Sequence, residues 1–364
     1  MVKKNSPLPT VHGWRINNMY KQRGLSIVEL MIAMSLSLLL AIGIYQVFTS
    51  NQQSARLTQA LVQVQDTGRL TLDLMSRDIR NADYWGCAGD VSRVSSTVDD
   101  SDPAVYDADL HGFGLAGQVG IEASDDVGAG VDIDGVGVRE GTDILEIRSM
   151  TSQGVSIAQA MPSAAAVLFV NQNLGFAQGD ILAVSDCESA DVFQVSNFNA
   201  AGGGTPGFNI VHNSGAGPVP GNTSGSLSKQ YPAGSQILFP VYRSYFINQD
   251  GDDSRLMVKD ETGTISVLSG GVEDMQLIFG LDSSGDGVAN QFVNAATILA
   301  DAALDFQQVL SVEVRLVIAS SQVNVVDAGI EYSWNGDAAL DAGVDLGRLR
   351  REFTAIATIR SRLP

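Results

Sequence analysis

The most constraining feature of the sequence is an uncharged apolar run near its N-terminus. From Leu30 to Phe48, nineteen consecutive residues carry no charge, and most of them are apolar. A helix of this length can span the hydrocarbon core of a bilayer. Glu29 is the only charged residue between Leu25 and Phe48. The run therefore predicts a membrane-spanning helix.

Charge is distributed unevenly on the two sides of this run. The 364-residue chain has 22 basic and 41 acidic residues, a net charge of −19. Residues 1–24 contribute five basic residues and no acid, so the remaining 340 residues carry a net charge of −24. By the positive-inside rule, the basic head stays in the cytoplasm and the acidic body crosses the membrane, into the periplasm of a Gram-negative cell. Because an acidic body repels phosphate backbones, we expect no direct binding of nucleic acid.

A second helical pattern continues directly from the apolar run. Residues 50–80 contain no proline, and residues suited to a buried face recur at spacings of three and four, namely Leu57, Leu61, Val64, Gly68, Leu72, Met75 and Ile79. This spacing is typical of one face of an amphipathic helix. We therefore predict one helix over residues 25–80, roughly 84 Å long at 1.5 Å per residue. No small-residue cleavage site follows the apolar run, which argues against an ordinary secretory signal.

The rest of the chain predicts a body made mainly of strands. Short segments rich in β-branched and aromatic residues occur at 142–148, 236–247, 255–259, 275–280, 309–318 and 353–359. A helix that buries one apolar stripe on antiparallel strands is an α+β arrangement. Two polar stretches rich in glycine or aspartate, residues 96–136 and 192–232, are predicted to be surface loops.

The residues at the start of the predicted helix resemble the class III signal of type IV prepilins and type II secretion pseudopilins. The string from Lys21 to Met31 is KQRGLSIVELM. The resemblance implies that a membrane peptidase cleaves after Gly24, that Leu25 becomes the N-methylated first residue, and that Glu29 is the fifth mature residue. Cleavage removes the charged head and frees an amine, which the Glu29 of a neighbouring helix can neutralise in an apolar bundle.

Further segments of the sequence resemble one particular family among the prepilins and pseudopilins. Residues 81–87, 179–187, 271–275 and 353–362 resemble segments of the minor pilins called PilW. Two residues depart from the general pattern, because Leu25 stands where phenylalanine is usual and Gln46 stands where major pilins commonly have a helix-bending proline. Gln46 and the 340 residues left after cleavage argue against a major pilin. The resemblance implies a pilin-like fold, a long N-terminal helix packed on an antiparallel sheet.

The resemblance also implies a division of the chain, a location and a set of partners. Residues 1–24 would be a cytoplasmic leader that is removed, 25–48 the transmembrane and assembly helix, 49–80 the amphipathic half of the same helix, and 81–364 a β-rich periplasmic body. Before assembly the protein would be a single-pass protein of the inner membrane, and afterwards it would lie at the pilus tip. Expected partners are other minor pilins, the major pilin, the prepilin peptidase, the inner-membrane assembly platform and a tip adhesin.

Three functions from different classes follow from these observations. The first is a minor pilin that helps to initiate the type IV pilus and supports adhesion, twitching motility or DNA uptake. The second is a minor pseudopilin of a type II secretion system, which shares the signal and the helix-on-sheet body. The third is a membrane-tethered periplasmic binding module or enzyme. Walker A, His-Glu-x-x-His and Gly-x-Ser-x-Gly motifs are absent from the sequence, so we expect no enzymatic activity.

The two cysteines of the chain, Cys87 and Cys187, both lie beyond the membrane segment. The periplasm permits disulfides, so a structural bridge is predicted. It would close a loop of about 100 residues, which the chain-entropy model values at roughly 4.7 kcal/mol. A redox-active thiol pair and a metal site are the alternatives, but the sequence lacks a Cys-x-x-Cys spacing, and only His111 and His212 follow residue 24.

An acidic turn suggests a weak calcium site. It places oxygen-bearing groups at positions 1, 3, 5, 7 and 9 of a calcium-loop spacing, supplied by Asp282, Ser284, Asp286, the carbonyl of Val288, and Asn290. Position 12 is Val293, where such loops have a bidentate glutamate. Calcium is therefore a candidate ligand, while glycine and aspartate are also the ordinary residues of β-turns.

Overall fold

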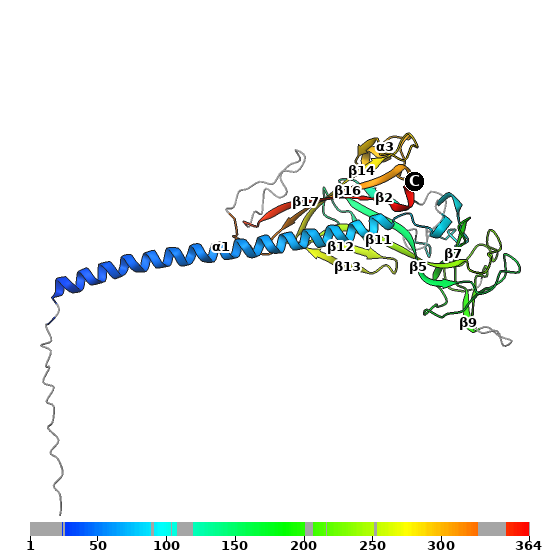
Figure 1. Cartoon of the computed structure of the whole chain (residues 1–364), viewed down its shortest axis with the longest axis horizontal. Helices are drawn as coiled ribbons and strands as arrows, with labels where there is room; N and C mark the ends of the chain where they lie inside the picture. Colours follow the sequence, from blue (N-terminus) through cyan, green and yellow to red (C-terminus); the bar gives the residue numbers. More distant parts are fainter. Residues whose placement is uncertain are drawn as a thin grey trace, which may run out of the picture. The chain divides into compact units, whose positions relative to one another are not determined.

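The computed structural model describes residues 24, 26–88, 91–102, 104–107, 119–200, 207–215, 217–250, 253–326 and 347–363. The chain forms two compact units, residues 1–55 and 56–364. Helix α1 (Ile27–Asn81) supplies most of the first unit and the beginning of the second (Figure 1). A long N-terminal helix followed by a β-rich body confirms the predicted α+β, pilin-like fold. The predicted divisions after residues 24, 48 and 80 stay predictions.

The part of α1 that belongs to the second unit is amphipathic, as its sequence predicts. Its buried residues are Ala60, Val64, Gly68, Thr71, Leu72, Met75, Ser76 and Ile79. Leu57 and Leu61, predicted on the same stripe, are half-buried. Val62 and Leu70 face outward. The helix therefore gains its tertiary contacts along one face, which a 3.6-residue repeat keeps continuous over several turns.

Within the described residues, an eight-stranded sheet forms the largest part of the body. Its main path runs β1-β8-β7-β11-β12-β13, with β5 also paired to β11 and β2 to β5. All of these pairs are antiparallel except β1 with β8. The strands are β1 (Val94–Ser96), β2 (Ile121–Ser124), β5 (Ile144–Ser156), β7 (Ile181–Ser185), β8 (Ala190–Gln194), β11 (Gln236–Asp250), β12 (Asp253–Asp260) and β13 (Ile265–Gly270).

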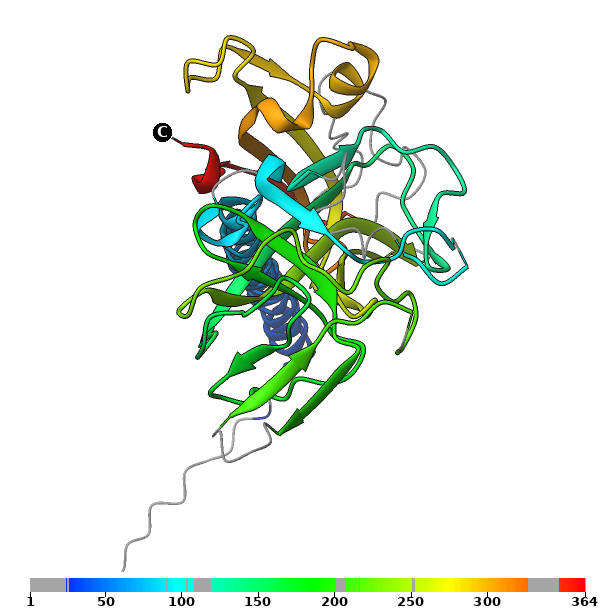
Figure 2. The same cartoon turned by 90° about the vertical axis from the view of Figure 1, so that its right-hand side faces the viewer.

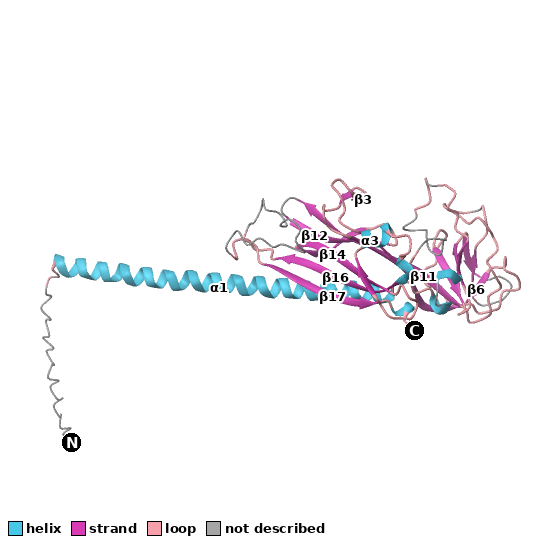
Figure 3. Cartoon of the chain, turned by 90° about the horizontal axis from the view of Figure 1, so that it is seen from above, coloured by secondary structure: helices cyan, strands magenta, loops and turns pink. Residues whose placement is uncertain are grey.

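A second, four-stranded antiparallel sheet contains the last strand of the chain. Its order is β15-β14-β16-β17, and Figure 3 shows β14, β16 and β17 side by side along α1. Its strands are β14 (Val272–Leu281), β15 (Gln291–Val293), β16 (Val309–Ala319) and β17 (Arg350–Thr358). The short helix α3 (Ala295–Ala300) follows β15, and the 3-10 turn η4 (Arg360–Arg362) follows β17. All six strands predicted from the sequence lie within or overlap strands of these two sheets.

The predicted surface loops are wrong in part. Residues 192–232 contain β9 (Asn197–Ala200) and β10 (Phe208–Val211), which form a three-stranded antiparallel sheet with β6 (Leu168–Val170). This sheet lies on the opposite side of the body from α3 (Figures 1 and 2). It helps to cover a separate core that buries Phe193 and Tyr231 completely. Apolar residues occur here only singly or in pairs such as Val192–Phe193 and Ile210–Val211, among many polar residues and glycines, so only pairing with distant strands reveals which of them are buried.

The second predicted loop, residues 96–136, is also partly core. It contains β2 and the short hairpin of β3 (Asp132–Ile133) and β4 (Val136–Gly137). Val119 and Ile121 are buried in the main core, beside apolar residues of α1 and of both large sheets. The aspartates and glycines of this stretch do form turns, but β2 contributes a buried face because it pairs with β5.

α1 packs closely against the second sheet at Gly68. A Cβ atom built on Gly68 would lie 2.5 Å from Cγ of Phe353 on β17. Glycine inside a helix costs about 1 kcal/mol relative to alanine. Here the missing side chain lets the phenylalanine ring lie directly on the helix backbone, so the local propensity cost is offset by close packing.

We predict that Gly68→Ala destabilises the body by about 1–3 kcal/mol, despite the better helix propensity of alanine, because overpacking forces the ring of Phe353 to move. Thermal or urea unfolding of the full chain in detergent measures the change. Phe353→Leu should make Gly68→Ala less costly in a double-mutant cycle. Gly43→Ala is the matched control, since a Cβ on Gly43 meets nothing within 4 Å. A gain in stability from Gly68→Ala would contradict this account.

Candidate processing and assembly site

The predicted processing site begins at an exposed glycine. Gly24 is exposed, and a Cβ built on it meets nothing within 4 Å. Leu25, the predicted new N-terminus and methylation site, lies outside the described residues, as do residues 1–23 of the predicted leader. The hydroxyl of Ser26 accepts a hydrogen bond from the Val28 N–H at 3.3 Å, which provides a cap for the first turn of α1.

Glu29 lies in the first turn of α1 and is exposed. It is the only charged residue between positions 26 and 55. The N-terminal end of a helix carries a partial positive charge, so a carboxylate in the first turn is locally favourable. Its exposure leaves it able to contact a group on another molecule, and the role predicted for it in assembly stays a prediction.

The first half of α1 exposes apolar side chains on every side. Large apolar residues from Ile27 to Phe48 are about half to three-quarters exposed. By length and composition, α1 could cross a membrane. The hydroxyls of Ser35 and Ser37 donate hydrogen bonds to the carbonyls of Ile32 and Ala33, at 2.9 and 2.7 Å. These polar groups are therefore satisfied within the helix, as a lipid or apolar helical environment requires.

In the second unit, the predicted disulfide between Cys87 and Cys187 is confirmed. Cys87 lies in a 3-10 turn, η1 (Gly86–Ala88), shortly after α1, and Cys187 lies in the turn between β7 and β8. The bridge closes a loop with a sequence separation of 100 residues and ties the exit of the helix to the large sheet. No free cysteine remains. A redox pair and a thiolate metal site therefore lose their support.

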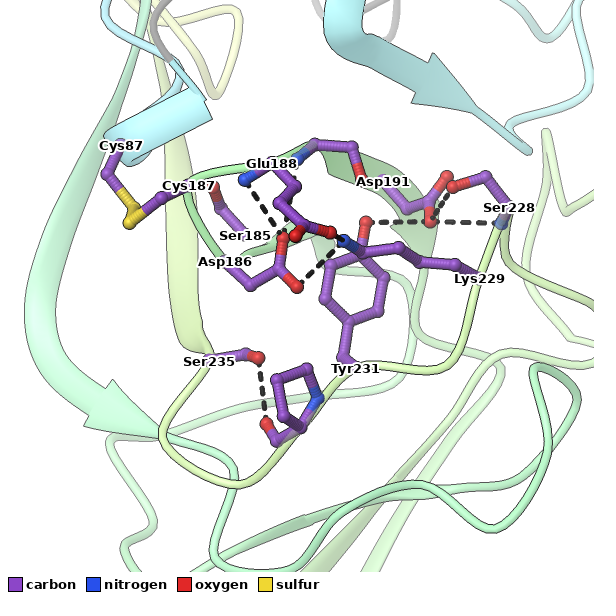
Figure 4. A network of polar contacts seen from close by, with 12 residues as sticks. Cys87, Ser185, Asp186, Cys187, Glu188, Asp191, Ser228, Lys229, Tyr231 and Ser235 are labelled. Carbon is purple, nitrogen blue, oxygen red and sulfur yellow. Dashed lines mark hydrogen bonds and ion pairs between the residues drawn. A yellow bond between two sulfur atoms is a disulfide. The ribbon is translucent and has the colours of Figure 1, made fainter.

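An ion-pair network surrounds the turn that carries Cys187 (Figure 4). The Lys229 ammonium lies 2.8 Å from carboxylate oxygens of both Asp186 and Glu188. Asp186 also accepts hydrogen bonds from the N–H groups of Glu188 and Ser189. Burial alone would raise the pKa of Asp186, but the contacts with Lys229 and these two N–H groups outweigh it and lower the pKa. The turn is thus held by charge as well as by the disulfide.

Asp191, on β8 directly after this turn, forms a buried polar centre. One carboxylate oxygen accepts hydrogen bonds from the backbone N–H and hydroxyl of Ser228, at 3.0 and 2.7 Å, and from the Tyr231 hydroxyl at 2.8 Å (Figure 4). Burial and the neighbouring Asp191 raise the pKa of Tyr231, so the phenol stays protonated and donates. These contacts anchor residues 228–231 to the large sheet.

The exit of α1 is fixed by Asp83, a residue that the sequence analysis did not single out. Its carboxylate accepts hydrogen bonds from the indole of Trp85 and the guanidinium of Arg362, each at 2.7 Å. The Ser361 hydroxyl donates to the carbonyl of Ala82 at 2.8 Å. Asp83 has a positive φ of 60°, and the absence of a side chain on Gly120 allows the two backbones to approach closely. The end of the chain is therefore attached directly to the end of the helix.

The only described histidine of the second unit, His212, is buried and serves packing. Its Nε2 atom lies 3.0 Å from the carbonyl oxygen of Ala166, and its ring contacts that of Phe193. Burial lowers the pKa of His212. His111, the other histidine of the predicted body, lies outside the described residues. The geometry of His212 gives no support to a general base at an open site.

The candidate calcium loop, residues 282–290, connects β14 to β15 and is organised by its first aspartate. The Asp282 carboxylate accepts hydrogen bonds from the N–H groups of Ser284, Gly285, Asp286 and Gly287. Burial would raise the pKa of Asp282, but these N–H contacts outweigh it and lower the pKa. Across the described part of the chain, no group of three or more His, Cys, Asp or Glu side chains could hold a metal ion. Calcium binding stays a prediction.

Comparison with known proteins gives two family matches. Residues 244–361 match the family described as "Type IV Pilus-assembly protein W", and residues 19–45 match the family described as "Prokaryotic N-terminal methylation motif". Together they confirm the resemblance to PilW-type minor pilins. No curated protein and no solved structure matches the chain.

The two matches cover different parts of the candidate site. The methylation-motif match spans Gly24 and Glu29, and the pilus-assembly match runs from the middle of β11 through β17 to η4. Of the four strings that resemble PilW, residues 271–275 and almost all of 353–362 lie inside the pilus-assembly match. Residues 81–87 and 179–187 lie outside it. The disulfide and Asp83 are therefore supported by the structure alone.

We predict that replacing both cysteines with serine lowers the free energy of unfolding by about 2–5 kcal/mol, because the unfolded chain regains the entropy of a long loop. Urea unfolding of the oxidised wild type and of Cys87→Ser/Cys187→Ser measures the loss. Reduced wild type serves as the control and should behave like the double variant. Equal stability of oxidised and reduced protein would contradict a structural role for the bridge.

Proposed function

We propose that this chain is a minor pilin that helps to initiate type IV pilus assembly and lies at or near the pilus tip, supporting adhesion, twitching motility or DNA uptake. The observation that carries the proposal is the order of features in one chain. A methylation-type signal precedes an apolar helix, and the same chain ends in a region that resembles a pilus-assembly protein. Both matched families are structural, so no catalytic step is part of the proposal.

The N-terminal region supports a role in assembly. The proposed peptidase cleaves between Gly24 and Leu25 on the cytoplasmic face, and the new amine of Leu25 is methylated. Glu29 then lies four residues from that amine, about one helical turn. In a bundle of apolar helices, an isolated amine and an isolated carboxylate are both costly, and pairing Glu29 with the amine of a neighbouring subunit relieves both costs.

Two features of α1 and the body support a subunit that occupies one position in a filament, rather than the major pilin that repeats along it. α1 runs through Gln46 without interruption, whereas the proline found there in major pilins bends the helix. The body also carries a second core around β6, β9 and β10, beyond the helix-on-sheet unit. We propose that the other minor pilins, the major pilin and the assembly platform contact the chain through α1, and that the body faces outward, where an adhesin could join it.

Deletion of the gene in a strain that cannot retract pili tests the proposed function. We expect few surface pili, restored by the wild-type gene, because an initiating subunit is needed before a filament can grow. Normal pilus numbers without adhesion would assign the chain to the tip but not to initiation. Normal pili with a defect in protein secretion would replace the proposal with a minor pseudopilin.

The first prediction about processing concerns Gly24. Gly24→Phe should block cleavage and leave a form that is 24 residues longer in the inner membrane. Since the position has free space around it, the effect would reflect recognition by the peptidase and not a folding defect. Intact-mass measurement reads the N-terminus, and wild type should begin with a methylated Leu25. Working pili that contain the chain with Met1 would overturn the assignment.

A second prediction separates assembly from folding at Glu29. Glu29→Ala should leave membrane insertion, cleavage and the Cys87–Cys187 bridge intact, yet reduce entry into pili by more than about tenfold, because an unpaired buried charge costs about 3–5 kcal/mol. Glu29→Gln should act similarly. Gln46→Ala, an exposed polar position on the same half-helix, is the control. Immunoblots of sheared pili measure incorporation, and wild-type levels for the alanine variant would argue for a hydrated, non-functional Glu29.

A further inference from the structure

A groove of about 660 Å³ lies where α1 ends against the large sheet. Its walls are the last turn of α1, residues 84–87, the middle of β5 and β11, and the turn η4. All of these residues belong to the second unit. A cavity of this size is in the range that accommodates several side chains of a ligand.

The rim of this groove is basic, which is unusual for the molecule. Arg80, Arg243 and Arg360 line it, and Asp78 is the one acid among its lining residues. A smaller adjoining hollow of about 220 Å³ shares Arg80 and Arg360 and adds Arg77 and Asp73. The chain after residue 24 has a net charge of −24, so four arginines against two aspartates form a local reversal of sign. We call these residues the arginine groove.

Among the described residues, three of the four arginines, Arg77, Arg80 and Arg360, have no carboxylate partner. Asp78 is engaged by the Tyr245 hydroxyl, and Arg243 pairs with Glu261. Among the described residues, Arg80 and Arg360 form no ion pair, although Arg80 is half-buried. A planar guanidinium binds carboxylates with two parallel hydrogen bonds, so Arg80 and Arg360 can each receive one carboxylate from another molecule.

The floor of the arginine groove is apolar and rigid. Trp85 and Met150 are buried, while Tyr84 is 38% exposed. The N–H of Met150 donates to the carbonyl of Tyr84 at 2.7 Å, and Trp85 is fixed by its hydrogen bond to Asp83. Cys87, tied to Cys187, also lines the groove. A preformed surface loses little conformational entropy when a ligand binds, so less of the binding free energy is spent on ordering the protein.

We propose that the arginine groove binds an acidic segment of a partner protein, with at least two carboxylates on Arg80 and Arg360 and an apolar side chain on Tyr84. The acidic surroundings disfavour a nucleic acid or an anionic membrane, which would bring many negative charges near the whole body. A short peptide brings its charges only to the arginines. The groove includes only the last turn of α1 and lies outside the assembly segment predicted at residues 25–48, so this inference does not depend on the role of Glu29.

Site-specific photo-crosslinking in cells tests the proposal on the full chain. A photoreactive phenylalanine analogue replaces Tyr84, which lines the groove, and mass spectrometry identifies the attached peptide. We expect a peptide from another protein that contains two or more Asp or Glu residues. Arg80→Glu/Arg360→Glu should lower the yield about tenfold, because two partly exposed ion pairs become repulsive. Arg255→Glu on β12 is the charge control, because the Arg255 side chain is 40% exposed and lies 3.9 Å from Asp250, outside the groove.

A charge swap decides between specific binding and mere proximity. Changing the acids of the cross-linked peptide to lysine should restore crosslinking to Arg80→Glu/Arg360→Glu. The neutral variant Arg80→Gln/Arg360→Gln should give an intermediate yield, and formation of the Cys87–Cys187 bridge in each variant verifies folding. The proposal would be overturned if the photoreactive residue attached to lipid, to a peptide without acidic residues, or to nothing. It would also be overturned if charge reversal left the crosslinking yield unchanged. Pilus number is counted separately, so failure here is distinguishable from failure of the proposed function.

Discussion

Burial of one stripe of α1 is the interaction on which the body depends. Val64, Leu72, Met75 and Ile79 enter the same core as residues of both large sheets. At Gly68 the backbone of the helix itself contacts Phe353, so the last strand of the chain packs on the middle of this stripe. Removing the helix would expose an apolar surface from two sheets at once, which makes α1 part of the fold as well as a membrane segment.

The residues directly after α1 connect the helix to the large sheet and to the C-terminal turn. Asp83 binds Trp85 and Arg362, and four residues later Cys87 is bonded to the β7–β8 turn. A displacement of this end of α1 would therefore reach the large sheet and the C-terminal turn through short, direct contacts. This is a physical reason for a disulfide at this point, since it ties the helix exit to a sheet strand that the chain reaches only 100 residues later.

The same exit creates the arginine groove. Arg80 belongs to the last turn of α1, where cations interact favourably with the helix dipole, and Arg360 follows β17. Their proximity is a consequence of the packing of β17 against the helix and of the Asp83–Arg362 contact. The local basic charge thus lies where the end of α1, the large sheet and the C-terminal turn η4 meet. A partner that bound there would contact all three elements.

The sequence by itself determined the elements whose signals are local. Nineteen uncharged residues predict a membrane helix, a repeat of three and four predicts its amphipathic continuation, and alternating β-branched residues predict the main strands. Two cysteines allow only one intramolecular pairing, and the predicted export to a compartment that permits disulfides favours it, so Cys87–Cys187 could be predicted as well. These predictions needed no knowledge of which strands are neighbours.

Tertiary structure alone decided the features that depend on contacts between distant residues. Phe193 and Tyr231 lie in a stretch rich in polar residues and glycine, and they are core because strands far apart in the chain cover them. Asp83 and Arg362, or Arg80 and Arg360, are about 280 residues apart, and no local pattern indicates that they meet. The physical reason is that hydrophobic spacing specifies which face of an element is buried, whereas the partner of that face is fixed only when the whole chain packs.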